Sequence, residues 1–271
     1  ETDGQCSNVR IWSNTFHDVL MGISLAPTYT GPTYAIRNLI YRTGMGNNDY
    51  TGSPFKFNSG YPKSGPMYLF HNTADAALPG NNGLYIKAPG TWDLIYARNN
   101  VWAGTDYAID NYNTSQPVDL DYDDLWTDSG GDLVRWDSTR YATLSDFTAA
   151  TGLESHGLSV APRFADPGNG DYTLDTSSDL IDAGVVIPGI NDQGGQASQG
   201  LGPDIGAFET PACTLEGDLD DDGDVDIDDV MAVAADWRNP DFDPTHDLDG
   251  DGDVDIVDIM LVAVHWGETC D

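Results

Sequence analysis

One acidic pattern occurs twice near the end of this 271-residue chain, and it restricts local folding more than any other feature. Residues 218–229 read DLDDDGDVDIDD and residues 247–258 read DLDGDGDVDIVD, so the copies lie 29 residues apart. Each copy has Asp at positions 1, 3, 5, 9 and 12 and Gly at position 6, where a sharp turn makes the carboxylates converge. Oxygen ligands at this spacing predict a calcium loop.

We therefore predict two Ca²⁺ ions, one in each loop, with position 7 contributing its backbone carbonyl oxygen. The predicted ligands in the first loop are Asp218, Asp220, Asp222, Asp224, Asp226 and Asp229. Those in the second loop are Asp247, Asp249, Asp251, Asp253, Asp255 and Asp258.

The repeat extends beyond the loops, because residues 218–237 and 247–266 agree at 14 of 20 positions and both end at Trp. After each loop, apolar residues recur at helical spacing, which predicts a helix of about three turns. Two tandem loop–helix units with Asp rather than Glu at position 12 resemble a type I dockerin over residues 216–267.

The resemblance implies docking onto a cohesin-like domain through loop positions 10 and 11. These positions hold Ile227 and Asp228 in one copy and Ile256 and Val257 in the other, unlike the Ser-Thr pair of cellulosome dockerins. The isoleucines either contact the partner or pack inside the module, since their helical phase allows both. The partner is a cohesin-like domain or a neighbouring copy of this chain.

The formal net charge is −34, which opposes binding to nucleic acid and to anionic lipid. No run approaches the ~18 consecutive apolar residues of a membrane-spanning helix. The chain starts ETDGQ, which we interpret as a processed or truncated start. We expect an extracellular protein, secreted or attached to the cell surface, because calcium is plentiful there.

Three cysteines are present. Cys213 and Cys270 bracket the acidic repeat, and we predict a disulfide between them, which an extracellular location permits. The alternative is two unrelated reduced thiols. Cys6 is left over, and it is either free or paired with a cysteine outside this sequence.

The first 210 residues repeat one phrase, an Asn or Asp after a strand-like run, at intervals of 24 to 34 residues. The phrase places Asn14, Asn38, Asn72, Asn99 and Asp123 at equivalent bends. This period predicts a solenoid in which stacked Asn side chains form a hydrogen-bonded ladder. It resembles the right-handed parallel β-helix of secreted bacterial carbohydrate-active and surface proteins.

The phrases PRF, DYTL, IDAG and DIGAFE between residues 162 and 209 resemble the final coils of such a β-helix family. We therefore predict a mainly β chain, with a parallel β-helix over 1–210, terminal coils at about 160–210, and a small α-helical calcium-binding dockerin over 211–271. A short helix is expected over 144–150, with Ser145 as its N-cap. Since no cap is visible at residue 1, we expect further coils before it.

No common catalytic motif is present in the sequence. Asp119, Asp121 and Asp123 alternate and would share one strand face, where they could bind calcium or serve as acid and base. Asp119 and Asp121, with Arg135 from the next coil, are therefore the catalytic candidates. A purely structural role is the alternative. Aromatic residues also recur along the coils, and they would form either an exposed strip that stacks on sugar rings or part of the core. These residues are Trp92, Trp102, Tyr107, Tyr112, Trp126 and Trp136.

These features favour an extracellular β-helix protein whose dockerin provides calcium-dependent attachment or assembly, as a non-catalytic surface, fibre or scaffold component. The alternative is a dockerin-tethered polysaccharide-active enzyme, a polysaccharide lyase first and a glycoside hydrolase second. The sequence specifies neither the glycan nor the docking partner.

Overall fold

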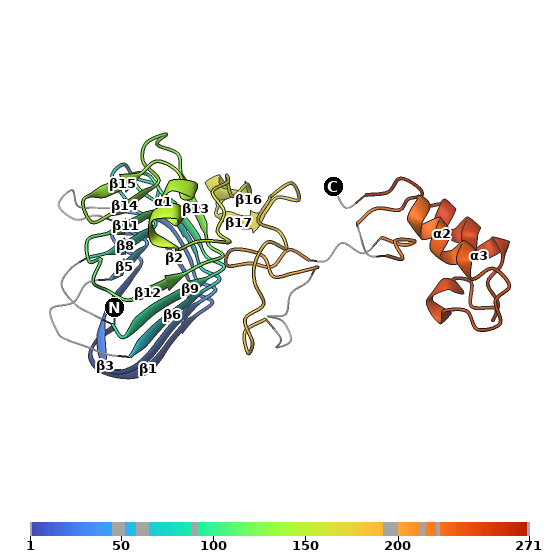
Figure 1. The fold of residues 1–271 in the computed structure, drawn as a ribbon, viewed down its shortest axis with the longest axis horizontal. Coiled ribbons are helices and arrows are strands. Elements are labelled where there is room, and N and C mark those ends of the chain that lie inside the picture. Colours follow the sequence, from blue (N-terminus) through green and yellow to red (C-terminus); the bar gives the residue numbers. More distant parts are fainter. Residues whose placement is uncertain are drawn as a thin grey trace. The chain divides into compact units, whose positions relative to one another are not determined.

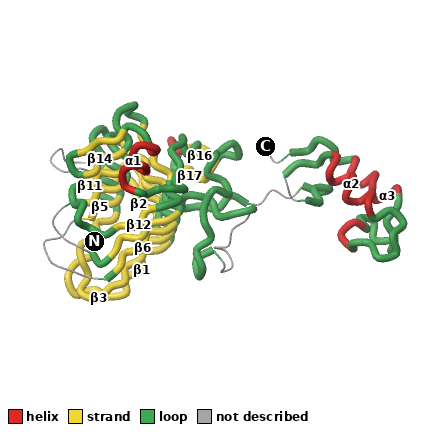
Figure 2. Tube along the Cα trace, viewed as in Figure 1, coloured by secondary structure: helices red, strands yellow, loops and turns green. Residues whose placement is uncertain are grey.

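The computed structural model divides the chain into two compact units, Glu1–Thr210 and Pro211–Asp271. It describes residues 2–44, 52–57, 65–87, 92–191, 200–211, 215–220 and 223–269. The first unit consists largely of strands, and the second holds two short helices (Figure 1, Figure 2).

The first unit is a parallel β-solenoid of about four turns, as the sequence predicted. The long strand β3 (Ile23–Ile36) bends between two sides of the solenoid, and its two halves start two stacks of parallel strands within one ten-stranded sheet. One stack contains β5 (Phe55–Phe57), β8 (Leu84–Ile86), β11 (Ile109–Asn111) and β14 (Val134–Trp136). The other contains β6 (Pro66–Phe70), β9 (Leu94–Arg98) and β12 (Val118–Leu120). β1 (Thr2–Trp12) pairs with the edge of β3 that faces away from β5 and β6.

A five-stranded parallel sheet forms the third side of the solenoid. Its strands, in spatial order, are β13 (Asp124–Thr127), β10 (Val101–Gly104), β7 (Thr73–Asp75), β4 (Leu39–Thr43) and β2 (Thr15–Val19). Each turn therefore visits all three sides before it stacks on the next turn (Figure 1).

The core forms because every second side chain of a strand points into the solenoid and stacks on its equivalent in the next turn. One such row runs through Ala35, Leu69, Ala97 and Leu120, and none of these is more than 1% exposed. Trp92 and Trp102 also lie in this core, so the predicted aromatic pattern is partly core rather than a surface strip. Tyr107 is buried, Tyr112 is 43% exposed, and Trp126 and Trp136 are half-buried.

The predicted asparagine ladder is present, with Asn100 in place of Asn99. The Oδ1 atom of Asn72 accepts the backbone N–H of Asn38 (3.1 Å) and its side-chain N–H (2.9 Å). Asn100 accepts the same two bonds from Asn72 (2.9 and 2.8 Å). These bonds satisfy backbone groups that the bend would otherwise leave buried and unpaired.

The residue before each ladder position has a left-handed backbone, which makes the turn between sheets. This position is occupied by Ser13, Arg37, His71, Asn99 and Tyr122, with φ between 51° and 60°. The prediction of Asn99 as a ladder residue is wrong, because Asn99 and Asn100 adjoin and the sequence pattern does not separate them. In the structure its side chain instead bonds the backbone N–H and carbonyl of Val185 (2.9 and 2.8 Å).

The solenoid ends in a cap. β14 pairs antiparallel with β15 (Thr139–Tyr141), and α1 (Leu144–Thr151) follows, with Phe147 fully buried. The helix is close to the predicted one, but its N-cap is Thr143 rather than Ser145, because the Thr143 hydroxyl accepts the Asp146 N–H (3.2 Å).

The described residues of the stretch 160–210 (160–191 and 200–210), expected to wind as terminal coils, instead fold over the outside of the five-stranded sheet. The antiparallel hairpin β16 (Phe164–Asp166) and β17 (Asp171–Leu174) forms a sheet of its own, with the short helix η1 (Pro167–Asn169) in its turn. Leu174, Leu180 and Ile205 pack on the outward side chains of β10. The apolar phrases of this segment thus cover a sheet face rather than extend the stack.

In the second unit, α2 (Ile227–Ala235) and α3 (Ile256–Ala263) follow the two acidic loops, with η2 (Pro244–His246) between them. The centre of this unit is built from four fully buried valines, two from the loops and two from the helices, namely Val225, Val254, Val233 and Val262. Among the described residues, no helix is both long and apolar enough to cross a membrane.

Candidate metal centre

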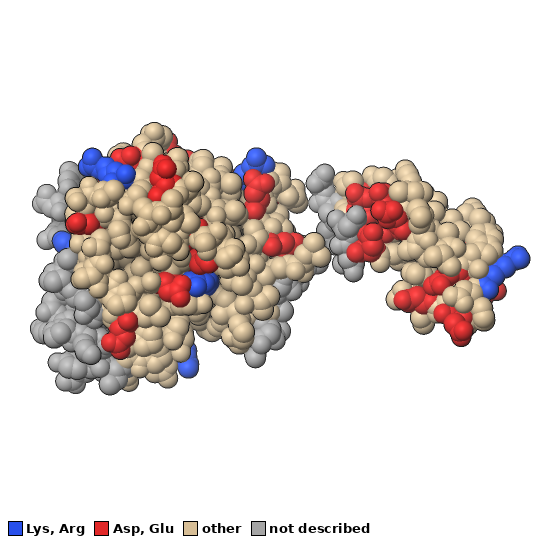
Figure 3. All heavy atoms as spheres, in the orientation of Figure 1, with Lys and Arg blue, Asp and Glu red and all other residues tan. Residues whose placement is uncertain are grey.

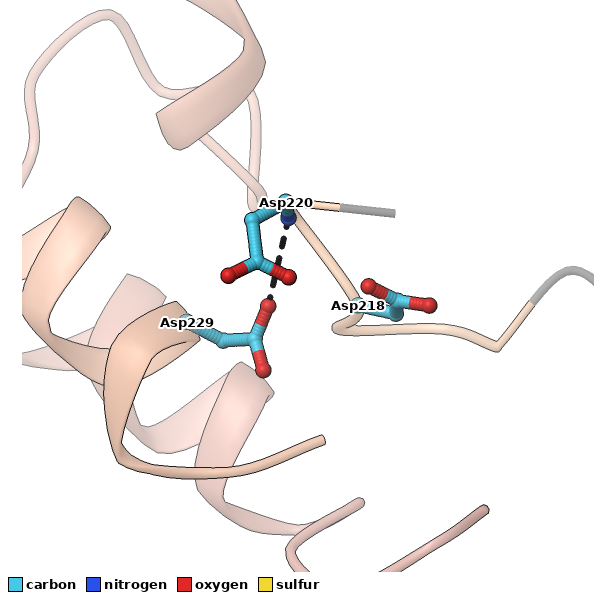
Figure 4. A group of neighbouring side chains, drawn as sticks. All are labelled: Asp218, Asp220 and Asp229. Atoms are coloured by element: carbon cyan, nitrogen blue, oxygen red, sulfur yellow. Dashed lines mark hydrogen bonds between the residues drawn. The ribbon is translucent and has the colours of Figure 1, made fainter. Parts of the chain in front are cut away.

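The two acidic loops each bring three carboxylates together. Oxygen atoms of Asp218, Asp220 and Asp229 all lie within 4.8 Å of one another, and the same holds for Asp247, Asp249 and Asp258. Figure 4 shows the Asp229 carboxylate, at the start of α2, facing that of Asp220 across the loop. Positions 1, 3 and 12 of the repeat thus converge twice.

Backbone N–H groups fix the carboxylate of position 12 at the base of each loop. Asp258 accepts the N–H groups of Leu248 (2.8 Å) and Asp249 (3.2 Å) on one oxygen, and that of Asp255 (2.7 Å) on the other. Asp229 accepts the equivalent bonds in the first loop. Burial alone would raise the pKa of Asp258, but these bonds outweigh it and hold its pKa below the usual value.

The glycine of position 6 has the left-handed backbone that the loop requires. Gly223 (φ 93°) and Gly252 (φ 97°) each donate an N–H to the position 1 carboxylate, at 3.0 Å in both loops. A bulkier residue would strain this turn, which explains the glycine in the repeat.

Position 9 caps the helix. Asp226 and Asp255 are the N-caps of α2 and α3, and each forms a reciprocal capping box with the position 12 aspartate. Their side chains accept the N–H of Asp228 and of Val257, both at 2.7 Å. These two predicted ligands therefore hold the helix start that carries Asp229 and Asp258.

Like charges crowd the second loop. Repulsion from Asp251, together with burial and other carboxylates, raises the pKa of Asp253, and burial with the same neighbours raises that of Asp249. Figure 3 shows acidic side chains gathered in clusters on this unit. A cation would relieve this repulsion, and its preferred donors, carboxylate oxygens, are the ones present. The residues fit a bound metal.

Some predicted residues lie outside the described part of the chain. These are the first-loop ligand Asp222 and both predicted disulfide partners, Cys213 and Cys270. The disulfide therefore stays a prediction. Asp224, at position 7, forms an isolated antiparallel bridge with Thr269, and Cys6 is exposed on β1.

The two halves of the unit exchange backbone hydrogen bonds with matched partners. Gly267 donates to the carbonyl of Val225 (2.8 Å), and Arg238 donates to the carbonyl of Val254 (2.9 Å). The two donors are 29 residues apart in the sequence, and so are the two acceptors, which is the offset of the repeat. The halves are therefore related by an approximate two-fold arrangement.

The helices expose apolar side chains at matched positions. Ile227 and Ile256 are each 50% exposed, so they do not pack wholly inside the unit, one of the two alternatives left open by the sequence. Met231 and Met260 are each 59% exposed, and Val257 is 43% exposed. The sequence did not identify these methionines as surface residues, because the apolar spacing of a short helix does not show which side of the helix is buried.

The weak catalytic candidates of the solenoid do not form one group. Asp119 pairs with Arg98 (2.7 Å) on β9, whereas Arg135 on β14 forms a bidentate pair with the buried Asp110 and lies against Tyr107 and Tyr112. β12 ends at Leu120, so Asp121 leaves the strand and Asp123 turns inward to the ladder. The expected single face with three carboxylates is therefore absent from these described residues.

Asp121 has a partner that the sequence did not indicate. Its two oxygens accept the backbone N–H of His156 (2.7 Å) and contact His156 Nδ1 (2.8 Å). The imidazole also stacks on Tyr122, with ring centroids 4.6 Å apart. The two residues are 35 positions apart and belong to no common motif, so the sequence alone did not indicate their contact.

Comparison of the chain with protein-family models, with curated proteins and with solved structures found no match.

Proposed function

We propose that the second unit is a calcium-binding attachment module of the dockerin type, and that it joins an extracellular β-solenoid to another protein. The observation that carries this proposal is the duplicated convergence of positions 1, 3 and 12, each within 4.8 Å, at the start of a capped helix. A solvated acidic tail that binds no cation would not require two loops of matched geometry.

Calcium is the cation that these loops suit, because it accepts six or more oxygen ligands in flexible geometry. The ion would supply positive charge that the loops lack, since neither loop sequence contains Lys or Arg. Asp220 and Asp249 would bind it directly, together with the position 1 and position 12 carboxylates. Binding only to the folded unit would stabilise that fold by mass action.

The exposed apolar residues of α2 and α3 are the proposed contact surface. Ile227 and Met231 in one half, and Ile256, Val257 and Met260 in the other, leave apolar area in water that a protein partner would cover. Asp228 lies beside Ile227 where the other half has Val257, so the two faces differ in charge. A cohesin-like domain is the proposed partner, with a neighbouring copy of this chain as the alternative.

Isothermal titration of the metal-free full chain with CaCl₂ tests the metal assignment. We expect two sites per chain and a gain in helical signal on binding. A chain that binds no calcium and keeps the same far-ultraviolet spectrum in chelator contradicts the proposal.

A second candidate function, polysaccharide cleavage by the solenoid, is favoured by one observation. Asp121 fixes His156 through Nδ1, so in the neutral ring the lone pair is on Nε2, and the side chain is 58% exposed. Such a base can abstract a sugar C–H proton, as a polysaccharide lyase requires. Ultraviolet absorbance of uronic-acid polymers incubated with the protein tests it: His156→Gln should abolish product formation, and Asp132→Asn should not.

A further inference from the structure

Three carboxyl groups are buried together where the ladder ends. Asp123 lies in the bend between β12 and β13, Asp124 begins β13, and Glu154 follows α1. Their residues are 0%, 0% and 2% exposed. Neither the ladder nor the proposed attachment function requires three acids here, because an amide already serves at the four ladder positions before Asp123.

Asp123 is well supported as a carboxylate. One of its oxygens accepts the backbone N–H and a side-chain N–H of Asn100 (2.8 Å each), and the other accepts the Trp102 indole N–H (3.0 Å). Hydrogen bonds of this kind favour the charged form.

Glu154 and Asp124 are each supported on one side only. Glu154 Oε2 accepts the Asp123 N–H (3.2 Å), and Asp124 Oδ1 accepts the Val160 N–H (3.0 Å). The second oxygen of each, Glu154 Oε1 and Asp124 Oδ2, is buried without a hydrogen-bond partner among the described residues. An ionised carboxylate in this position is strongly disfavoured, whereas a protonated one is tolerated.

The surrounding charges compensate these acids only in part. Arg98 favours the charged form of Asp123, but its guanidinium is paired with Asp119, and His156 is paired with Asp121. Asp121 and Asp123 both repel a charge on Glu154. Burial raises the pKa of Asp124 to about 7 and that of Asp123 to about 6, and burial followed by repulsion from Asp123 raises the pKa of Glu154 well above its usual value.

Asp124 and Glu154 lie where the cap meets the end of the solenoid, whereas the Asp123 side chain bonds back to the preceding turn. The Glu154 N–H donates to Leu120, the Leu158 N–H to Asp123 and the Leu125 N–H to Leu158, each at 2.9 Å, so the cap adds a last layer of backbone bonds to β12 and β13. Among the described residues no further turn stacks on this layer, so it is the part that can move away when a buried charge must reach water.

We propose that the segment 144–160 is a proton-dependent cap, seated on the end of the solenoid while Asp124 and Glu154 are protonated and loosened when they ionise. Because these carboxyls bind their proton more tightly in the seated state, seating is favoured below about pH 4, where both states are protonated, and is weakened as pH rises through about 7. Loosening would expose Phe147 and the edge of β13 to an incoming strand or partner.

Amide hydrogen exchange on the full chain tests the cap directly. Protection factors of Glu154, Leu158 and Leu125 should fall by at least about tenfold between pH 5 and pH 8, since one pKa unit corresponds to tenfold. The Thr73 amide, bonded to Asn38 in the middle turns, should keep its protection. Glu154→Gln and Asp124→Asn, singly and together, should remove the pH dependence, whereas the exposed Asp179→Asn should preserve it.

Two outcomes overturn the proposal. One is equal protection of the cap amides at pH 5 and pH 8 in the unsubstituted protein, which does not depend on whether any variant folds. The other is a loss of cap protection at pH 8 on adding EDTA, because a bound cation rather than a proton would then neutralise the acids.

Discussion

Arg37 Nη2 lies 2.6 Å from Glu209 Oε1, with both side chains at most 9% exposed. The pair joins two residues 172 positions apart and ties the end of the first unit to the second ladder turn. Glu209 also accepts the Asp204 N–H (3.1 Å), so one carboxylate holds both segments.

Replacing Glu209 with Gln should therefore destabilise the solenoid. The substitution keeps the shape but leaves the guanidinium charge buried, which typically costs about 3–5 kcal/mol. Calorimetric melting should show the solenoid transition at lower temperature. Arg42→Met, which breaks the exposed pair with Asp18, should lower the melting temperature far less, because water screens this pair; equal losses for both variants would contradict this reasoning.

Asn72→Ala should destabilise the solenoid more than Asn14→Ala. Asn72 is fully buried and both receives bonds from Asn38 and donates to Ala35 and Asn100, so its loss leaves buried groups unsatisfied at about 1–3 kcal/mol each. Asn14 is exposed on the first turn, where water replaces the lost bonds. Urea unfolding of the two variants would measure the difference, and equal midpoints would contradict the ladder's energetic role.

The repeated features of this chain were readable from sequence, and the unrepeated ones were not. Asn38 and Asn72 could be placed in a ladder because stacking imposes the same residue type at every turn. The position of 160–210 could not be predicted, because Leu174 and Ile205 look alike whether they face inward in a coil or cover a sheet from outside. Asp121–His156 and Arg37–Glu209 join distant segments, and a single sequence contains no signal of such contacts.

Asp229→Asn and Asp258→Asn should each reduce calcium binding from two sites to one. Each substitution replaces the carboxylate of position 12 with an amide, which keeps the size but removes the charge at the centre of one loop. Titration calorimetry would count the remaining sites. Asp228→Asn is the matched control, since this exposed residue neighbours Asp229 but lies outside the cluster of Asp218, Asp220 and Asp229. Loss of a site in the control, or retention of both in Asp229→Asn, would contradict the assignment.

Partner binding should tolerate loss of either apolar face but not of both. The two faces differ in charge at Asp228 and Val257, but Ile227 and Ile256 are related by the repeat and equally exposed, so each can anchor the same apolar contact. Ile227→Asp or Ile256→Asp alone should weaken capture of a cohesin-like domain only slightly, while the double variant should abolish it, with calcium binding retained in all three. Light scattering with and without calcium would reveal the alternative, since growth in particle size without added partner indicates self-association. A calcium-loaded chain that binds neither a cohesin-like domain nor itself would contradict the attachment role.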